Sequence, residues 1–216
     1  MIAKQLDQSL ERLKTDYVDV YFMHRDNTNV LVGEFVDAMD AEVKRGRIRG
    51  IFGGSNWNRE RMDEAATYAQ KNGKAAPAAL SNNFSLAEML DPIWAGCVAA
   101  SDDGWKKWQK ERQIPNFAWS SQGRGFFTER AGRDKRDDEE IVRVWYSDRN
   151  FDRRDRAIQL AKELGRNPIH IALAYVIAQP FPVIPLIGPR TIGELEDSLS
   201  ALDIQLTPGQ VSWLEA

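Results

Sequence analysis

Hydrophobic positions along the chain follow two alternating patterns, and each pattern predicts one kind of element. Short, nearly continuous apolar runs predict buried parallel strands, whereas apolar residues spaced three and four positions apart predict helices. The apolar runs predict five strands, at residues 17–24, 47–52, 78–80, 116–120 and 182–187. The helical spacing predicts helices at about 1–13, 30–45, 59–71, 156–164, 169–177, 192–202 and 209–215, with a further helical segment around Trp105 and Trp108.

Residues that favour helix ends lie at several of these boundaries. Gly46 and Gly165 are placed to end helices, and Asn58 is placed to cap one. The first helix is different, because its apolar stripe is already present at Ile2, directly after Met1, with no capping residue before it. Two explanations stay open: the helix continues from a preceding segment, or it is a frayed terminal helix capped by water.

The regular alternation of strand and helix predicts an α/β protein with a parallel sheet. No glycine-rich dinucleotide fingerprint follows any strand, which argues against a Rossmann fold. The even spacing favours a (β/α)8 TIM barrel, which has eight strands in about 250 residues. We therefore expect residues 1–216 to form a single, partial barrel domain truncated to about five βα units. An open arc of strands would leave two edges unpaired, so self-association across those edges is possible.

Composition limits the partners and the setting. The 29 basic and 32 acidic residues leave a net charge of -3, which argues against nucleic acid or an anionic membrane held by bulk charge. No apolar run approaches the ~18 residues of a membrane span. The single Cys97 cannot form an internal disulfide, which predicts a reducing, cytoplasmic setting. Charges of alternating sign at 128–155 predict a solvated loop and a helix start rather than a binding patch.

Histidine is the first candidate for chemistry, because the chain has only two. His24 ends the first predicted strand, and parallel α/β proteins place their reactive groups at the carboxyl ends of strands. His170 lies within a predicted helix, so we expect it to be structural or exposed. No metal site is expected.

Four segments in register resemble the aldo-keto reductases. They are Tyr17–His24, Gly50–Trp57, Trp119–Gly125 and Ile184–Thr191. They occur in that family's order and at about its spacing, and the similarity covers essentially the whole chain. The resemblance implies a barrel that binds NADP(H) and reduces a small carbonyl compound. It also implies that the family's first three strands would lie upstream of Met1.

The same resemblance makes His24 the histidine that hydrogen-bonds the carbonyl oxygen and orients it. In the family, the proton comes from a tyrosine whose pKa is lowered by a lysine paired with an aspartate. Those three residues belong to the family's early strands, which implies that this chain lacks them. Four residues of this chain have the same chemistry but are no substitutes, because they belong to a different strand and its preceding helix: Lys14, Tyr17, Asp19 and Tyr21.

The resemblance also assigns residues to the nicotinamide end of the cofactor. Ser55 and Asn56 correspond to the pair that hydrogen-bonds the carboxamide. Ser81 stands where the family usually has glutamine, so Asn82 or Asn83 could take over that contact. Trp119 stands where an aromatic ring stacks on the nicotinamide.

The resemblance assigns the phosphate and adenine ends of the cofactor to later segments of the chain. Ser120 and the Gln122-Gly123-Arg124 turn are assigned to the pyrophosphate, because small residues and backbone amides let phosphate approach closely. Gly188, Arg190 and Thr191 precede a helix, the usual phosphate position of the barrel fold. Arg190 is assigned to the adenosine 2′-phosphate, which favours NADP over NAD. Glu194 or Asp197 is assigned to the adenine amino group, and Ser198 stands where the family often has asparagine. For each loop residue, an ordinary barrel turn is the alternative.

Trp57 and Trp94 are candidates for the walls of a substrate pocket, with plain core packing as the equal alternative. Tryptophan faces would suit sugars or other ring compounds. The sequence leaves two candidate functions. The first is an NADP(H)-dependent oxidoreductase that reduces an aldehyde or ketone, with this chain inactive by itself. The second is a non-enzymatic nucleotide-binding or regulatory barrel completed by self-association.

Overall fold

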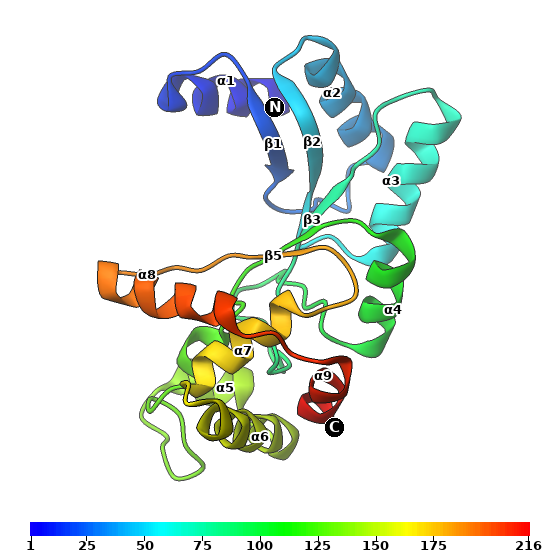
Figure 1. Cartoon of the computed structure of the whole chain (residues 1–216). Coiled ribbons are helices and arrows are strands. Elements are labelled where there is room, and N and C mark those ends of the chain that lie inside the picture. The colour runs from blue at the N-terminus through cyan, green and yellow to red at the C-terminus, as the bar shows by residue number, and fades with distance from the viewer. The chain divides into compact units, whose positions relative to one another are not determined.

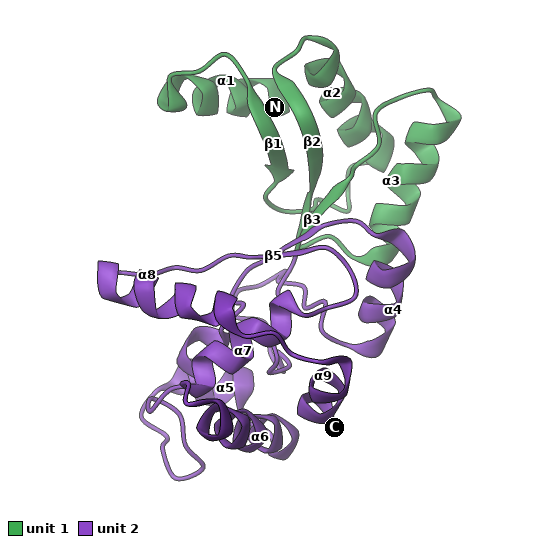
Figure 2. Cartoon of the chain, viewed as in Figure 1, with its two compact units in different colours: residues 1–81 green, residues 82–216 purple.

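The computed structural model describes residues 1–216 without a gap, and helices alternate with strands along most of the chain (Figure 1). The chain divides into two compact units, unit 1 from Met1 to Ser81 and unit 2 from Asn82 to Ala216 (Figure 2). The expectation that the whole chain forms one barrel domain stays a prediction.

Unit 1 consists of three helices and three parallel strands. Its elements are α1 (Ile2–Leu13), β1 (Val18–Met23), α2 (Val32–Lys44), β2 (Ile48–Ser55), α3 (Arg59–Lys71) and β3 (Ala79–Ser81). β1 pairs with β2, and β2 pairs with β3, both in parallel. The predicted order of elements is therefore confirmed in this unit. Asn58 caps α3 as expected, because its side chain accepts a hydrogen bond of 2.7 Å from the Arg61 amide.

Strand β2 is longer than its hydrophobic run predicts. The sequence suggests a strand ending at Phe52 and a glycine turn after it, but Gly53 and Gly54 continue the strand opposite Ala79 and Leu80. A Cβ atom on Gly53 would collide with the carbonyl oxygen of Ala79, and one on Gly54 would collide with the indole of Trp57. The glycines therefore permit close packing rather than a turn.

Two features of unit 1 differ from what the sequence predicts. β1 is not covered on both faces, because Asp19 and Val20 are exposed. Its continuous apolar run reflects the preference of aromatic and β-branched side chains for strands rather than burial on both sides. The helix predicted at 30–45 begins only at Val32, because Leu31 precedes the first turn of α2, where its side chain is 74% exposed.

Unit 2 contains the remaining elements. They are α4 (Asp103–Arg112), β4 (Asn116–Ala118), the 3₁₀ turn η1 (Gly123–Gly125), α5 (Glu139–Trp145), α6 (Asp148–Leu164), α7 (Pro168–Ile177), β5 (Val183–Pro185), α8 (Ile192–Leu199), the 3₁₀ turn η2 (Ser200–Asp203) and α9 (Pro208–Glu215). β4 and β5 pair in parallel, with Phe117 opposite Ile184. The α/β class with parallel strands is confirmed.

The charge-rich segment 128–155 is more helical than its charges suggest. α5 occupies part of it, and α6 begins at Asp148 rather than Arg156 because Ser147 caps it. Most of its charges nevertheless lie at the surface, as expected, but Arg153 is buried. The guanidinium of Arg133, for example, pairs with three aspartates on the outer face of α6, namely Asp148, Asp152 and Asp155.

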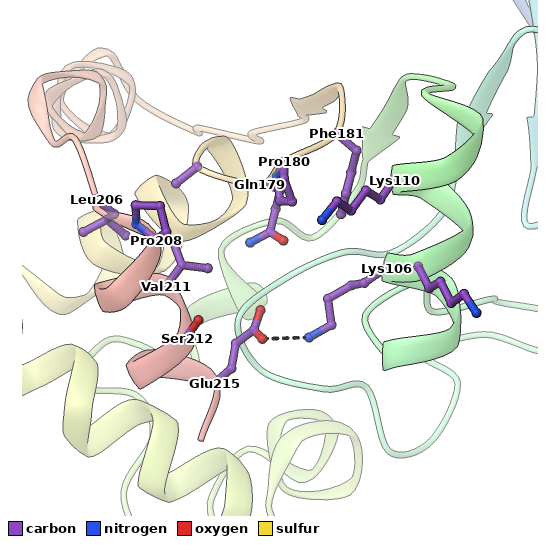
Figure 3. Close-up of a pocket in the computed structure, with 12 residues that line it drawn as sticks. Lys106, Lys110, Gln179, Pro180, Phe181, Leu206, Pro208, Val211, Ser212 and Glu215 are labelled. Carbon is purple, nitrogen blue, oxygen red and sulfur yellow. Dashed lines mark ion pairs between the residues drawn. The ribbon is translucent and has the colours of Figure 1, made fainter.

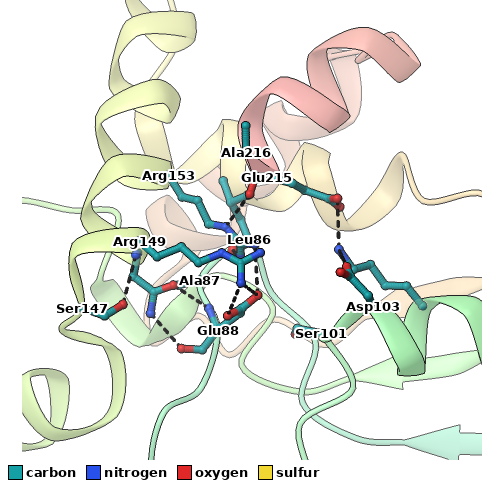
Figure 4. A network of polar contacts seen from close by, with 12 residues as sticks. Leu86, Ala87, Glu88, Ser101, Asp103, Ser147, Arg149, Arg153, Glu215 and Ala216 are labelled. Carbon is teal, nitrogen blue, oxygen red and sulfur yellow. Dashed lines mark hydrogen bonds and ion pairs between the residues drawn. The ribbon is translucent and has the colours of Figure 1, made fainter.

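A buried arginine joins three parts of unit 2 (Figure 4). Arg153 of α6 is 1% exposed; its Nη1 donates to the Leu86 carbonyl at 3.0 Å and its Nε to the Glu215 carbonyl at 3.2 Å. Its Nη2 lies 3.1 Å from Glu88 Oε1. Because a buried cation is stable only when paired and hydrogen-bonded, these contacts fix α9 and the segment after β3 to α6. None of the helices is both long and apolar enough to cross a membrane.

Candidate functional site

Three of the residues assigned to the nicotinamide amide meet in unit 1, at the carboxyl ends of β2 and β3. Ser55 lies opposite Ser81 in the strand pairing, and its hydroxyl donates to the Ser81 carbonyl at 3.0 Å. The side-chain amide of Asn56 donates to Ser55 Oγ at 3.1 Å, and the Asn56 backbone amide donates to the Ser81 carbonyl at 3.1 Å. All three residues are buried. The structure thus gathers Ser55, Asn56 and Ser81 into one hydrogen-bonded group.

His24 lies at the same edge of the strands. It directly follows Met23, which is opposite Gly54, so it is near Ser55 in the parallel register. Its imidazole is exposed. An accessible imidazole at a strand end can donate a hydrogen bond to a small molecule.

The loop that follows His24 is held by a buried arginine that the sequence did not single out. Arg61 Nε lies 3.2 Å from Asp26 Oδ1, and its Nη2 donates to the Val30 carbonyl at 2.6 Å. Arg61 occupies the first turn of α3, where the sequence gives no reason to expect burial. Only the contact with a loop more than thirty positions earlier in the chain reveals its role.

Two tyrosines of unit 1 have a raised pKa rather than the lowered pKa that a proton donor needs. Burial raises the pKa of Tyr21, although a hydrogen bond with Ser9 opposes part of this rise. The pKa of Tyr68 is also raised, because its hydroxyl donates to Asp37. A tyrosine that gives up its proton near neutral pH needs a lowered pKa, so neither fits that task.

Trp57 fits the core-packing alternative rather than a pocket wall. Its side chain is fully buried and meets Phe35 edge to face, with ring centroids 5.6 Å apart. The guanidinium of Arg61 lies 5.5 Å from its ring, and Gly54 leaves room for the indole. Trp57 therefore supports the end of β2 and the loop that follows β1.

Trp94 lies among residues assigned to the cofactor in unit 2. It is 53% exposed, and its ring centroid is 6.3 Å from that of Trp119. The guanidinium of Arg124 lies 5.5 Å from the Trp94 ring and pairs with Glu140 at 2.7 Å. The structure therefore joins one candidate pocket residue to two candidate cofactor residues.

Left-handed backbone occurs at three of the assigned positions. Asn56 has a φ of 58°, Ser120 of 51° and Arg124 of 52°. The two other non-glycine residues with positive φ, Lys14 and Gln113, cap the ends of helices, where this conformation is usual. Strained non-glycine backbone away from helix ends gathers at ligand sites. All three strained residues follow strands.

Beside Trp119, unit 2 has buried polar atoms that lack partners. Asn83 donates from Nδ2 to the Trp119 carbonyl at 3.0 Å, and Asn116 Oδ1 accepts from the Asn82 amide at 3.1 Å. Asn83 Oδ1, Asn116 Nδ2 and Trp119 Nε1 are buried without a hydrogen bond. Orphaned donors and acceptors of this kind need a ligand or water. Together they offer one acceptor and two donors, the complement of a group that both donates and accepts.

The turn after β4 is connected to the last strand and its helix. Gln122 Nε2 donates to Ser198 Oγ at 3.3 Å, which brings together two residues assigned to the cofactor. Gly123 supplies a φ of 64° at the turn. Ser121, which the sequence did not assign, donates from Oγ to the Leu186 carbonyl at 2.9 Å. Because Ser121 and Leu186 are distant in the chain, no local pattern could have shown this contact.

The turn before α8 contains a carboxylate at the position assigned to phosphate. Thr191 caps α8 by accepting from the Glu194 amide at 3.1 Å. Glu194 Oε2 in turn accepts from the Arg190 amide at 2.6 Å. The Arg190 side chain is exposed and forms no ion pair, whereas Gly188 has open space around it. A phosphate could use the Arg190 guanidinium, but it would compete with Glu194 for the backbone amide.

Asp197 already has a structural partner. Its Oδ1 lies 2.9 Å from Nε2 of His170, which is buried on α7. The other ring nitrogen of His170 accepts from the Asn167 amide at 3.4 Å and completes a capping box. The pair thus links α7 to α8, so an adenine ring would compete with His170 for Asp197. Nowhere in the structure do three or more His, Cys, Asp or Glu side chains form a group that could hold a metal ion.

Sequence comparison agrees with the resemblance carried by the four segments. The model of the aldo/keto reductase family matches residues 1–216. An uncharacterised oxidoreductase of Bacillus subtilis, YrpG, is 28% identical over 205 residues, which cover 95% of this chain and 60% of YrpG. The aldo-keto reductase ausK of Aspergillus calidoustus is 27% identical over 96% of this chain and 51% of its own length.

Solved structures show the same fold. A thermostable aldo-keto reductase in complex with the inhibitor epalrestat matches with a TM-score of 0.74 and 22% identity, over 99% of this chain and 65% of that protein. An aldo-keto reductase of Klebsiella pneumoniae in complex with NADPH matches with a TM-score of 0.72 and 23% identity, over 99% of this chain and 63% of that protein. The predicted barrel type is confirmed.

The chain therefore spans about half to two thirds of the length of these relatives. The family model nevertheless matches this chain from its first residue to its last. The chain belongs to the aldo/keto reductase family.

Proposed function

We propose that this chain supplies the NADP(H)-binding and carbonyl-orienting part of an oxidoreductase that reduces an aldehyde or ketone to an alcohol. The observation that carries the proposal is the hydrogen-bonded group of Ser55, Asn56 and Ser81, which lies at the strand end next to His24. Its hydroxyls and amides suit a carboxamide held beside a reacting carbonyl.

NADP(H) is the proposed cofactor for three reasons. Left-handed backbone occurs at Asn56, Ser120 and Arg124, buried polar atoms lack partners beside Trp119, and the Arg190 guanidinium is exposed without an ion pair. Two solved relatives from Klebsiella pneumoniae are complexes with NADPH and NADP. When bound, the cofactor supplies the hydride.

In this proposal, His24 donates a hydrogen bond to the carbonyl oxygen and fixes its orientation. Reduction also needs a proton donor, and the raised pKa values of Tyr21 and Tyr68 make them unsuitable. We therefore propose that the 216-residue chain does not turn over carbonyl compounds by itself. Absence of a general acid removes a rate factor of about 10²–10⁴. Turnover with NADPH that is lost in His24→Ala would contradict this part of the proposal. We also propose a reducing, cytoplasmic setting, which the single Cys97 suits.

Nucleotide titration tests the cofactor assignment. We expect the full chain to bind NADPH more tightly than NADH, and Arg190→Gln to reduce that difference, because its guanidinium would pair with the 2′-phosphate. Arg12→Gln is the matched control, since Arg12 is also exposed and forms no ion pair. Equal binding of both nucleotides, or an equal effect of both variants, would remove Arg190 from the cofactor site. Absence of binding to either nucleotide would contradict the proposed function.

A second candidate function is a non-enzymatic nucleotide-binding or regulatory protein that self-associates. The observation that favours it is that apolar side chains are exposed on or beside strands that have an unpaired edge. In unit 1, β1 pairs with β2 and exposes Val20. In unit 2, β5 pairs with β4 and exposes Ile184 and Leu186. Free edges of this kind favour association between chains.

A further inference from the structure

Unit 2 has a cavity of about 400 Å³ that the proposed oxidoreductase site does not use (Figure 3). It lies between α4, α9 and the segment that leads from α7 into β5. This segment enters the amino end of β5, whereas Gly188 and Arg190 follow the carboxyl end of the same strand. The volume is within the range of about 300–1,000 Å³ that is typical of small-molecule sites.

The walls of the cavity differ in chemistry. Its apolar surface comes from α9, the two segments before β5 and α9, and the end of α7; the residues are Ala178, Pro180, Phe181, Leu206, Pro208 and Val211. The opposite wall is one face of α4, which contributes Lys106, Lys107 and Lys110. A ligand in this cavity would therefore contact apolar surface on one side and ammonium groups on the other.

The one acidic residue of the lining, Glu215, is already neutralised. Its Oε2 lies 3.0 Å from Lys106 Nζ, and its Oε1 accepts a hydrogen bond of 2.5 Å from the Tyr175 hydroxyl. Burial, followed by the charge of Glu215, raises the pKa of Tyr175, so this hydroxyl keeps its proton and continues to donate. Glu215 is therefore not available to balance the other lysines.

Lys110 leaves a surplus of positive charge at this wall. It forms no ion pair, whereas Lys107 pairs weakly with Glu111, at 3.9 Å. In Figure 3 the ammonium group of Lys110 is directed toward Pro180 and Phe181. An unpaired cation beside apolar side chains is complementary to an anion with an apolar body.

We propose that this cavity binds a small organic anion with an apolar body, of which a medium-chain carboxylate is the simplest example. Its carboxylate pairs with Lys110, with Lys107 close by, and its chain covers Phe181 and Val211. Binding here is independent of NADP(H), because none of the residues assigned to the cofactor lines the cavity.

Calorimetric titration of the full chain with octanoate, 1-octanol and octyltrimethylammonium tests the proposal without NADP(H). We expect octanoate to bind more tightly than the alcohol, and the cation not to bind. Lys110→Glu should weaken octanoate binding by about threefold to tenfold, since it reverses one partly exposed charge. Val211→Asp, which places a carboxylate on the apolar wall, should abolish binding. Circular dichroism of each variant establishes that it is folded.

Lys162→Glu is the matched control, because Lys162 is also exposed in the last turn of a unit 2 helix but does not line the cavity. Octanoate affinity that falls equally in Lys162→Glu and Lys110→Glu would overturn the proposal, as would equal affinity for octanoate and octanol. Sedimentation with phosphatidylglycerol vesicles tests whether the lysines bind an anionic lipid surface instead of a free small anion. Vesicle binding lost in Lys110→Glu, without binding of free octanoate, would assign the lysines to a lipid surface and overturn the small-molecule site.

Discussion

Glu194 is placed to affect nucleotide preference at the proposed cofactor site. Its carboxylate accepts the backbone amide of Arg190 at 2.6 Å, at the turn where a phosphate is expected. A carboxylate there repels a 2′-phosphate, yet the same group is an acceptor for an adenine amino group. The two roles predict opposite effects of Glu194→Gln on the affinity for NADPH.

We expect Glu194→Gln to tighten NADPH binding by about twofold to fivefold, and NADH binding much less, because the substitution removes one exposed like charge near the extra phosphate. Fluorescence titration of both nucleotides measures this effect. Glu196→Gln, an exposed carboxylate on the same helix, is the control. Weaker binding of both nucleotides in Glu194→Gln would instead identify Glu194 as an adenine acceptor.

Acid sensitivity can also be assigned to single carboxylates. The hydrogen bond from Lys44 at 2.7 Å, followed by that from the Ala75 amide at 3.0 Å, lowers the pKa of Asp40 in the folded chain. A lowered pKa contributes stability above the unfolded value of about 3.9, and this contribution is lost as the pH falls through the folded value.

Asp40→Asn should therefore flatten the decline of the free energy of unfolding as the pH falls below about 5. Urea unfolding at several pH values measures this slope. Asp16→Asn, at an exposed carboxylate without a partner, should leave the slope unchanged. An unchanged slope in Asp40→Asn would show that other carboxylates dominate acid unfolding.

At the scale of elements, the close approach of β2 to its neighbours depends on glycine. Gly53→Ala places a methyl group against the Ala79 carbonyl oxygen, and backbone on both sides prevents relief. We expect a loss of about 2 to 4 kcal/mol in the free energy of unfolding. Gly188→Ala is the control, because it meets open space at an ordinary backbone angle and should change stability by less than about 0.5 kcal/mol. Similar losses in both variants would contradict this account of β2.

Elements with clear periodicity and capping residues could be predicted from the sequence. The helix at 59–71 was predicted with its bounds, because Asn58 caps it. α5 was missed although Ile141, Val144 and Trp145 have helical spacing, since the charges around them suggested a solvated loop. The true length of β2 was missed because glycine pairs normally indicate turns.

The candidate site was predictable only where it follows strand ends. Ser55, Asn56 and Ser81 come together because parallel strands end at one edge. Arg61 and Ser121 could not be found in this way. Their contacts lie more than thirty positions away in the chain, and burial of polar side chains has no local signal.

At the scale of the whole molecule, unit 2 exposes an apolar stripe on and after α8. Its members are Ile192, Leu195, Leu199 and Leu202, the first of them 75% exposed. Spacings of three and four place them on one helical face. Because large exposed apolar patches mark interaction surfaces, this stripe gives self-association a physical basis.

We expect the full chain to form dimers or larger species as its concentration rises, and Ile192→Lys with Leu202→Lys to shift it toward the monomer. Sedimentation velocity over a range of concentrations measures the distribution. Leu164→Lys, at another exposed leucine of unit 2, should have little effect. A monomer at every concentration, or an equal shift in the control, would contradict association through this stripe.

Trp57 gives the molecule an optical property that follows from its burial. It is the only tryptophan in residues 1–81, while the other six lie in residues 82–216. Its indole is enclosed beside Phe35 and the Arg61 guanidinium, so its emission should move to longer wavelength when unit 1 unfolds. The difference in fluorescence between the parent chain and Trp57→Phe isolates that signal. Following it in urea reveals whether the two units melt together or one after the other.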